Sequence, residues 1–189
     1  MADRRDWDRR YSEGAVERVR PILVLVANVH LLPRTGRALD LACGLGGNAR
    51  LLAGRGLQTQ AWDQSPVAID KINAYAQRAG LPLRGQVRDV ERDPPEPESF
   101  DVITVGHYLD RAGASDLIRA LRPGGVLFYQ TYTRECVDVI GPRRSEYRLA
   151  INELLELFAG LRVLVYREEG RVGDLRIGWR NEAMLVAVK

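Results

Sequence analysis

Cysteines and long apolar runs are both scarce in this 189-residue sequence. The two cysteines, Cys43 and Cys136, form no disulfide framework, which is typical of a protein in a reducing compartment. They also lack the spacing of metal ligands, so the sequence predicts no metal site. The longest apolar candidate, residues 22–32, is interrupted by Asn28 and His30 and is too short to span a bilayer. These absences argue against a disulfide scaffold and a membrane-embedded protein, and they favour a cytoplasmic one.

Lysine is also rare, since Lys71 and Lys189 are the only two, although the formal net charge is +3. The other basic residues are arginines scattered among 25 acidic residues. They form no basic stripe with interleaved aromatic side chains, the pattern expected of a nucleic-acid-binding surface. The charged amino end, residues 1–14, does not resemble a signal peptide. We therefore expect neither a nucleic-acid partner nor a membrane partner.

What the sequence does contain is a glycine-rich turn between two regular elements. The apolar run at residues 38–42 predicts a strand that is buried on both faces of a parallel sheet. Gly44, Gly46 and Gly47 then let the backbone turn tightly against a ligand. The helix predicted from about residue 48 to 54 directs its unpaired N–H groups back at that turn, which favours an anionic group there.

A carboxylate follows the next predicted strand, residues 58–62. Asp63 lies where it can accept hydrogen bonds from two adjacent ribose hydroxyls. Residues 44–49 also satisfy the dinucleotide-binding fingerprint in its Gly/Ala form, so glycine spacing alone does not identify the cofactor. Asp40 favours a different one, because a carboxylate near the strand end repels a diphosphate and attracts an ammonium or a sulfonium.

The order Asp40, Gly44 and Gly46 resembles the D/E-x-x-x-G-x-G loop of class I S-adenosylmethionine-dependent methyltransferases. The resemblance implies S-adenosylmethionine as the cofactor and continues along nearly the whole chain. The further strands it predicts are residues 83–87, 99–105, 126–130, 161–166 and 183–188. The implied fold is α/β: a three-layer, Rossmann-like sandwich with a mostly parallel seven-stranded sheet, one antiparallel strand and helices on both faces. We expect one domain over residues 1–189.

Three connecting segments carry further expectations. Residues 13–32 are predicted to be helical with an interruption at Pro21, and residues 1–32 as a whole are expected to be an amino-terminal helical segment that contributes to the cleft for cofactor and acceptor. A helix is expected to end before Pro123, after which two glycines reverse the chain. Residues 131–150 form the longest irregular segment and are expected to frame the acceptor pocket.

The resemblance assigns the cofactor to the carboxyl edge of the sheet, with an acidic residue and the following N–H beside the adenine. The cofactor-binding residues expected there are Asp40, Ala42, Gly44, Gly46, Asn48, Asp63, Gln64, Ser65, Asp89, Val90, Gly106 and His107. Ser65 is also expected to cap the following helix, with Pro66 in its first turn.

Outside the glycine loop, the chain contains in order Trp7, Arg10 and Tyr11, a Tyr-Leu pair followed by Arg111, the run at residues 129–132, Gly141-Pro142 and the run at residues 152–155. This order resembles the small bacterial methyltransferases of the tellurite-resistance type. Members of that group are thought to methylate oxyanions of tellurium and selenium or other small, soft nucleophiles. The residues expected to line the acceptor pocket are Tyr11, Tyr108, Arg111, Tyr132, Arg143 and Tyr147. The Arg143-Arg144 pair is more basic than expected for a methyltransferase of this type. It indicates either an anionic acceptor or a solvated loop.

Methyl transfer needs little catalytic apparatus, because a sulfonium already carries an activated methyl group. An acceptor with a low pKa needs no base. If a base is needed, His107 is the candidate, although a histidine there can also just line the site. Two alternatives remain open at this point: a domain that binds S-adenosylmethionine without catalysis, and an NAD-type oxidoreductase. The expected partner is a small-molecule acceptor, and the oligomeric state is open.

Overall fold

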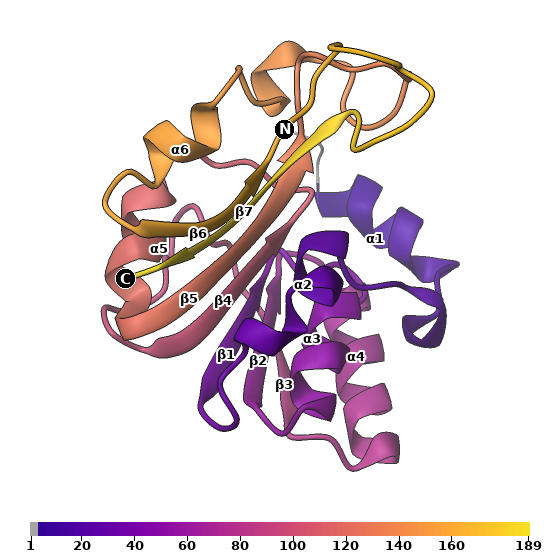
Figure 1. Cartoon of the computed structure of the whole chain (residues 1–189). Coiled ribbons are helices and arrows are strands. Elements are labelled where there is room, and N and C mark those ends of the chain that lie inside the picture. Colours follow the sequence, from indigo (N-terminus) through magenta and orange to yellow (C-terminus); the bar gives the residue numbers. More distant parts are fainter. Residues whose placement is uncertain (1–3) are drawn as a thin grey trace.

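The computed structural model describes residues 4–189, and its centre is one seven-stranded sheet. Its strands are β1 (Arg37–Leu41), β2 (Gln58–Asp63), β3 (Leu83–Val87), β4 (Phe100–Gly106), β5 (Leu121–Tyr132), β6 (Arg162–Arg167) and β7 (Glu182–Val188). They lie in the order β3-β2-β1-β4-β5-β7-β6 (Figure 1). Among the described strands, β7 is the one that runs antiparallel to both neighbours. The predicted mostly parallel sheet with one antiparallel strand is confirmed.

Helices cover both faces of this sheet. The helices are α1 (Arg4–Ser12), α2 (Leu23–Ala27), α3 (Gly47–Gly54), α4 (Pro66–Ala79), α5 (Ala114–Ala120) and α6 (Glu153–Leu157), with short 3-10 turns η1 (Val16–Arg18), η2 (Val29–Leu31) and η3 (Ser145–Tyr147). Between residues 4 and 189, no helix combines the length and the apolar character that crossing a membrane requires.

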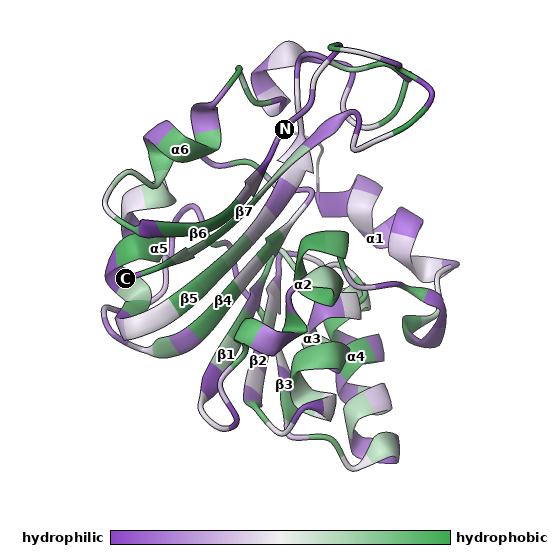
Figure 2. Cartoon of the chain, viewed as in Figure 1, coloured by the Kyte–Doolittle hydropathy of each residue, from purple (hydrophilic) through white to green (hydrophobic). Residues whose placement is uncertain are grey.

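Apolar side chains fill the space between the sheet and each helical layer. On one face, Trp62 of β2 belongs to the same buried cluster as Leu117 of α5 and Leu154 of α6. On the other face, Phe128 of β5 is buried in a cluster with Leu52 of α3. Each such side chain contributes about 1.5–3 kcal/mol when it is fully buried. Figure 2 shows the hydrophobic colour concentrated in the central strands, as the predicted three-layer sandwich requires.

The amino-terminal segment differs from the helix predicted over residues 13–32. It contains only η1, α2 and η2, because Pro21 supplies no N–H and the apolar residues around it pack directly onto the sheet. A nine-residue helix, α1, precedes them; it lies in the amino-terminal segment that was expected to be helical, although its bounds were not predicted. None of its residues is fully buried, and its aromatic face is limited to Trp7 and Tyr11, which stack with ring centroids 5.6 Å apart. Residues 1–3 of the expected segment lie outside the described residues.

The prediction for the entry into β5 was only partly right. Helix α5 ends at Ala120, before Pro123 as expected, but the strand already begins at Leu121. The two glycines do not reverse the chain. They lie in an irregularity where the pairing with β4 skips from Leu121 to Val126, and Gly124 takes a φ of 79°. This bulge absorbs the extra residues and keeps the rest of β5 in register.

Candidate functional site

The glycine turn after β1 has the backbone shape of a ligand cradle. Ala42, Gly44 and Gly46 have positive φ angles of 53°, 52° and 75°, a conformation that costs an L-residue such as Ala42 roughly 1–2 kcal/mol. Gly46 is the N-cap of α3. A Cβ atom added to Gly46 would lie 3.0 Å from the Ile72 side chain, so a larger residue there would crowd the turn.

Asp63 ties the end of β2 to this turn. Its Oδ2 accepts a hydrogen bond from the Gly44 N–H at 2.8 Å, and its Oδ1 accepts one from the Ser65 N–H at 2.9 Å. The side chain is almost fully buried, and this burial raises the pKa of Asp63 despite the two backbone donors. Each carboxylate oxygen can accept more than one hydrogen bond. Asp63 therefore retains acceptor capacity for ribose hydroxyls next to the glycines.

Asp40 supports the turn from inside the protein. Its carboxylate accepts hydrogen bonds from the Asn48 amide, the Ala49 N–H and the Thr104 hydroxyl, each at 3.0 Å. The side chain is completely buried, which raises the pKa of Asp40 to about 7. The Asn48 amide oxygen in turn accepts from the Ile22 N–H at 2.9 Å. These two predicted cofactor residues hold the turn and the amino-terminal segment together.

Helix α1 lies beside the glycine turn (Figure 1). A Cβ atom on Gly44 would lie 3.1 Å from the Tyr11 hydroxyl, so this predicted pocket residue is at the cofactor turn itself. Burial, with the nearby Asp63 carboxylate, raises the pKa of Tyr11. The Lys71 ammonium of α4 donates to the carbonyl oxygens of Tyr11, Ser12 and Gly14 at 2.8, 2.6 and 2.7 Å. One lysine thus fixes the carboxyl end of α1.

The amino end of α4 makes a second connection to α1. Ser65 caps α4 as predicted, because its hydroxyl oxygen accepts from the Ala68 N–H at 3.2 Å, and Pro66 occupies the first turn. The same hydroxyl donates to the Asp8 carboxylate of α1. Ser65 is fully buried. The predicted cofactor residue at this position therefore joins two helices at the edge of the turn.

A buried arginine shapes the connection from β3 to β4, which contains no helix. The guanidinium carbon of Arg88 lies 3.8 Å from the centre of the Trp62 ring, and Nε donates to the Asp93 carbonyl oxygen at 2.8 Å. These contacts hold the loop on Trp62 of β2. Asp89, which is exposed, and Val90, which is half-buried, follow directly after Arg88. Both residues therefore lie just beyond the carboxyl end of β3, the edge at which the resemblance expects the adenine.

Tyr108 lies with this loop. Its hydroxyl donates to the Glu91 carboxylate at 3.2 Å, and its side chain lines a small pocket with Val90 and Tyr129. Burial, with the Glu91 charge, raises the pKa of Tyr108. Although it is adjacent to His107 in the sequence, Tyr108 is therefore grouped with the predicted adenine-side residues.

His107 follows Gly106 at the carboxyl end of β4 and has an unusual backbone conformation, with a φ of 56°. Its ring stacks on Tyr132 of β5 with centroids 4.9 Å apart and planes inclined by 26°. Its Nε2 lies 2.8 Å from Oε1 of Glu182, the first residue of β7. The sequence analysis missed Glu182. Its position directly before the predicted closing strand was the available signal.

The loop at residues 133–148 is fastened behind Tyr132. Arg148 is buried and donates to the carbonyl oxygens of Thr133 at 2.9 Å and Pro142 at 2.7 Å. A Cβ atom on Gly141 would lie 2.6 Å from the Tyr132 ring, so the loop backbone packs against that ring. The segment predicted to be irregular, residues 131–150, is so only in part, because residues 131–132 belong to β5 and residues 145–147 form η3. The internal hydrogen bonds of the loop fix its shape.

Arg111 braces the same loop. Its guanidinium donates to both carboxylate oxygens of Glu153 and to the carbonyl oxygens of Glu146 and Arg148. These bonds lower the pKa of Glu153. The predicted pocket residue Arg111 is thus committed to protein partners, which leaves it no evident freedom to follow an acceptor.

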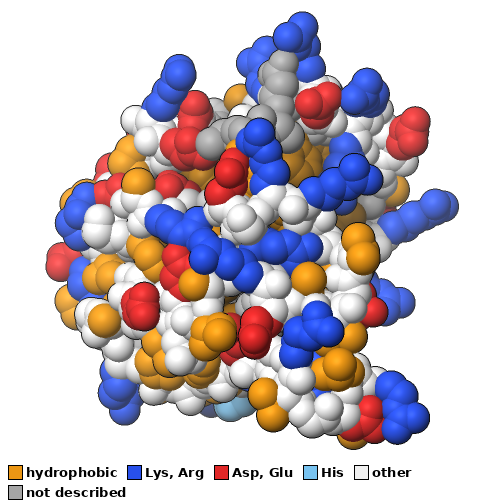
Figure 3. Space-filling model, turned by 90° about the horizontal axis from the view of Figure 1, so that it is seen from above, with side chains coloured by type: hydrophobic (Ala, Val, Ile, Leu, Met, Phe, Trp, Pro, Cys, Tyr) orange, Lys and Arg blue, Asp and Glu red, His pale blue; other side chains and the backbone are white. Residues whose placement is uncertain are grey.

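Two other predicted pocket residues lie on the outer part of this loop: Arg143 is exposed and Tyr147 is half-buried. Figure 3 shows Lys and Arg side chains gathered on the face that contains the upper loops. We use the name "the rim" for His107, Tyr132, Glu182, the loops at residues 133–148 and 168–181, and the Arg111–Glu153 pair that braces the first of these loops.

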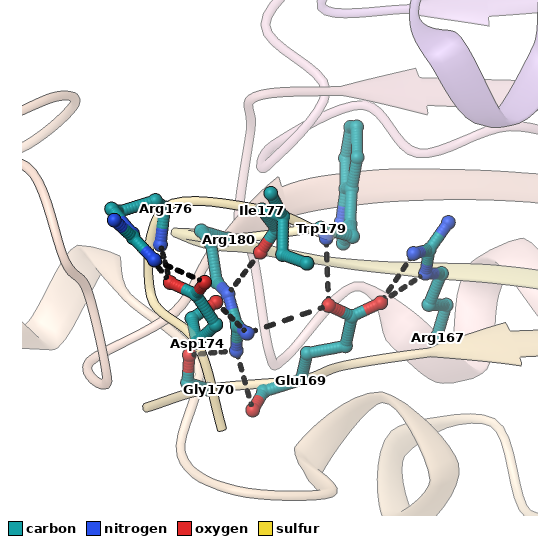
Figure 4. A network of polar contacts seen from close by, with 8 residues as sticks. All are labelled: Arg167, Glu169, Gly170, Asp174, Arg176, Ile177, Trp179 and Arg180. Carbon is teal, nitrogen blue, oxygen red and sulfur yellow. Dashed lines mark hydrogen bonds and ion pairs between the residues drawn. The ribbon is translucent and has the colours of Figure 1, made fainter. Parts of the chain in front are cut away.

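The second loop of the rim precedes β7 and is held by ion pairs (Figure 4). Glu169 accepts from the Trp179 N–H at 2.7 Å and pairs with Arg167. These partners lower the pKa of Glu169. Arg180 donates to the carbonyl oxygens of Glu169 and Gly170 at 3.2 and 3.0 Å. The network fixes the loop that leads into β7.

Asn181 joins the two loops of the rim immediately before Glu182. Its amide oxygen accepts from the N–H groups of Val137 and Asp138 at 2.7 and 2.8 Å, and its carbonyl oxygen accepts from the Thr133 N–H at 2.9 Å. Glu182 is therefore anchored through its neighbour as well as through the sheet. Within residues 4–189, no three His, Cys, Asp or Glu side chains are grouped so that they could hold a metal ion.

The comparisons with known proteins agree with this geometry. Residues 38–125 match the family described as "Methyltransferase domain". A ubiquinone biosynthesis O-methyltransferase of Methylocella silvestris is 32% identical over 165 residues, which cover 76% of this chain and 64% of that protein. The chain thus spans less than two thirds of that relative's length.

Solved structures share the fold at low sequence identity. TehB from Haemophilus influenzae has a TM-score of 0.70 with 21% identity, covering 88% of this chain and 61% of that one. An S-adenosylmethionine-dependent methyltransferase from Mesorhizobium loti has a TM-score of 0.69 with 17% identity, covering 93% and 100%.

The sheet order, the glycine turn and the carboxylate after β2 define a class I, S-adenosylmethionine-dependent methyltransferase fold. Residues 38–125 are similar to the family described as methyltransferase domain, and the fold is one that S-adenosylmethionine-dependent methyltransferases of known structure share. The residues at the turn fit S-adenosylmethionine, because Gly44 leaves room beside Tyr11 that a side chain would fill and Asp63 keeps acceptor capacity next to it.

Proposed function

We propose that this chain transfers a methyl group from S-adenosylmethionine to a small-molecule acceptor held between α1 and the rim. The observation that carries the proposal is the meeting of two kinds of group at one edge of the sheet. The glycine turn with Asp63 follows β1 and β2, and His107 with Tyr132 follows β4 and β5. In an open α/β sheet this edge is the place where ligands bind.

Bound S-adenosylmethionine supplies an electrophilic methyl group on a sulfonium. The work of the protein is to position the acceptor and to exclude water, and such positioning is worth about 7–11 kcal/mol in well-oriented reactions. Gly44, Gly46 and Asp63 would hold the cofactor. Tyr11 of α1 lies next to Gly44, so α1 would cover the cofactor side of the cleft and limit its access to solvent.

A small acceptor is favoured by the size of the connecting segments. The connection from β4 to α5 covers only residues 107–113, and the longer loop at residues 133–148 is folded onto Tyr132. Neither segment offers an extended surface for a polymer. Selectivity would then come from the few side chains at the rim.

Two acceptor chemistries have support. The resemblance to tellurite-resistance-type methyltransferases favours a soft sulfur, selenium or tellurium nucleophile or an oxyanion, and the arginines of the rim suit an anion. The name of the Methylocella silvestris relative favours an oxygen acceptor. A domain that binds S-adenosylmethionine without catalysis would turn over neither.

Labelled S-adenosylmethionine, incubated with the protein and separately with tellurite, selenite, 2-mercaptoethanol, catechol, bulk RNA or a protein lysate, tests the proposal. We expect labelled product with at least one small acceptor. Labelling confined to RNA or protein would overturn the small-acceptor assignment. Binding of S-adenosylmethionine with no labelled product from any acceptor would favour the silent binding domain.

A further inference from the structure

Glu182 connects His107 to the interior of the protein through a chain of hydrogen bonds. Its Oε1 lies 2.8 Å from Nε2 of His107, and its Oε2 accepts from the Gln130 amide nitrogen at 2.6 Å. The Gln130 amide oxygen accepts from the Val24 N–H at 2.8 Å. The side chain of Glu182 is 12% exposed and that of His107 is 41% exposed. The chain therefore runs from a buried backbone group to a partly exposed imidazole that follows the carboxyl end of β4.

The direction of every bond in this chain is fixed by its buried end. The Val24 N–H can only donate, so the atom of Gln130 that faces it must be the amide oxygen. The Gln130 NH2 group must then face Glu182 and donate to it. A carboxylate only accepts, so the remaining bond requires a proton on Nε2 of His107. The neutral imidazole consequently has Nδ1 as its free, basic nitrogen.

The imidazole is also held in one orientation. Stacking on Tyr132 defines the ring plane, and the Gly141 backbone packs against the Tyr132 ring. The His107 N–H donates to the Gln130 carbonyl oxygen at 2.8 Å. This bond helps to hold the positive φ of 56°, which costs a non-glycine residue on the order of 1–2 kcal/mol. Strain of this kind, kept by surrounding contacts, is common at functional sites.

We propose that Glu182 is a positioning residue that fixes the tautomer of His107, and that Nδ1 of His107 is the general base for an acceptor with a hydroxyl nucleophile. This inference rests on the proposed function and narrows its acceptor. The O–H proton passes to Nδ1, the oxygen forms its bond to the methyl carbon as the carbon–sulfur bond breaks, and the sulfur leaves with that electron pair as neutral S-adenosylhomocysteine.

The hydroxyl class follows from the presence of a built base. Oxyanions and thiolates already carry a nucleophilic electron pair, so an oriented imidazole gives them no advantage. A hydroxyl is a poor nucleophile until its proton is removed, and a positioned base typically contributes about 10²- to 10⁴-fold in rate. A base held in its tautomer by a third group is the general arrangement for activating such a nucleophile.

Heteronuclear NMR of the histidine ring nitrogens tests the positioning role directly in the cofactor-free protein. The chain has two histidines, so a His30→Gln variant assigns both signals. In the neutral ring of the wild-type protein, we expect the proton on Nε2 of His107. In Glu182→Gln, the new amide oxygen accepts from Gln130 and the new NH2 group faces Nε2, which moves the ring proton to Nδ1. Glu146→Gln, at an exposed pair with Arg144, is the matched control and should leave the tautomer unchanged.

Turnover with catechol and calorimetric binding of S-adenosylmethionine complete the test. We expect Glu182→Gln to lose about tenfold or more in turnover while its S-adenosylmethionine affinity stays within about twofold. A wild-type Nδ1–H tautomer, an unchanged tautomer in Glu182→Gln, or equal turnover by both proteins would overturn the inference. Methylation of tellurite, selenite or a thiol without catechol would overturn the hydroxyl acceptor and leave the small-molecule function standing. Labelling of RNA or protein alone would overturn that function, and with it the hydroxyl acceptor.

Discussion

The glycine turn and the rim hold their carboxylates by opposite means. Asp40 and Asp63 at the turn are buried among backbone N–H groups and neutral side chains, and burial raises the pKa of both. Glu153 and Glu169 at the rim accept hydrogen bonds from arginines, which helps to lower the pKa of both. The turn is thus a low-charge interior, whereas the rim is a charged outer wall.

This difference matches the tasks that we propose for the two regions. The glycine turn is built from backbone atoms, so its shape depends little on side chains. Such a site suits a cofactor that is the same in every reaction of this kind. The rim is built from long side chains, and residues such as Arg148 and Arg180 hold its loops through hydrogen bonds. A surface of this kind can change by substitution while the fold is kept. Acceptor choice would therefore be decided at the rim and cofactor choice at the turn.

The largest effect is expected from Gly46→Val. The new side chain would meet Ile72 and would have to adopt a φ near 75°, so S-adenosylmethionine binding should become undetectable by calorimetry while the protein stays folded. Gly56→Val is the matched control, because Gly56 also has a positive φ but faces open space. It should lose stability without losing binding. Normal binding by Gly46→Val would place the cofactor elsewhere.

The pH dependence of stability should separate the two regions. Asp40 has a folded pKa of about 7 against an ordinary value of 3.8, so the native state holds its proton more tightly than the unfolded chain. Its contribution to the free energy of unfolding is therefore greatest below about pH 4 and falls as the pH rises to about 7, by roughly 1.4 kcal/mol per unit of pKa. Urea unfolding of the wild type and Asp40→Asn across this range measures it.

The rim gives the opposite sign. The lowered pKa of Glu153 stabilises the native state at neutral pH, and this contribution is lost as the pH falls below the ordinary value of 4.5. Glu153→Gln should therefore flatten the acid side of the stability profile, and Asp40→Asn the side toward neutral pH. Identical profiles for the two variants would contradict the comparison.

Asp63→Ala should weaken S-adenosylmethionine binding by more than about tenfold, or 1.4 kcal/mol, because ribose hydroxyls would lose a charged acceptor in a buried cleft. Asp101→Ala provides the control. Asp101 also accepts from a backbone N–H, that of Arg37 at 2.7 Å, but it lies at the opposite end of the sheet. An unchanged affinity in Asp63→Ala, with the fold intact by circular dichroism, would remove Asp63 from the site.

The two lysines offer a smaller and sharper test. Lys71 donates to carbonyl oxygens at the end of α1, and Lys189 donates in the same way to those of Arg119 and Leu121, far from the cleft. Lys71→Met should release α1 and reduce turnover several-fold, whereas Lys189→Met should change stability only. We expect the loss in Lys71→Met because α1 would no longer exclude water. Equal turnover in both variants would show that α1 is not a cover.

Sequence separation explains which parts could be predicted. The bond between Gly44 and Asp63 joins residues 19 apart within one strand-turn-helix-strand unit, and the pattern of that unit is visible in the sequence. The contact between His107 and Glu182 joins residues 75 apart. No local pattern specifies which side chains meet when β4 and β7 approach the same end of β5, so Glu182 was missed and His107 was assigned only from its place after a strand.

The same reasoning applies to the segments outside the sheet. Helix α1 lies in a segment that was expected to be helical, but its bounds could not be predicted, because the contacts of Lys71 and of Asp8 that hold it involve residues distant in the sequence. Arg111 was expected in the acceptor pocket because of the resemblance to the methyltransferases of the tellurite-resistance type. Its partner Glu153, 42 residues away, could be assigned only once α6 was placed.

Calorimetric titration with S-adenosylmethionine, S-adenosylhomocysteine, NAD and NADP tests the central claim most directly, because it asks which ligand the glycine turn and Asp63 are shaped to hold. We predict saturable binding of S-adenosylmethionine and S-adenosylhomocysteine, lost in Gly46→Val, and no binding of either dinucleotide. Binding of NAD or NADP without binding of S-adenosylmethionine would contradict the account.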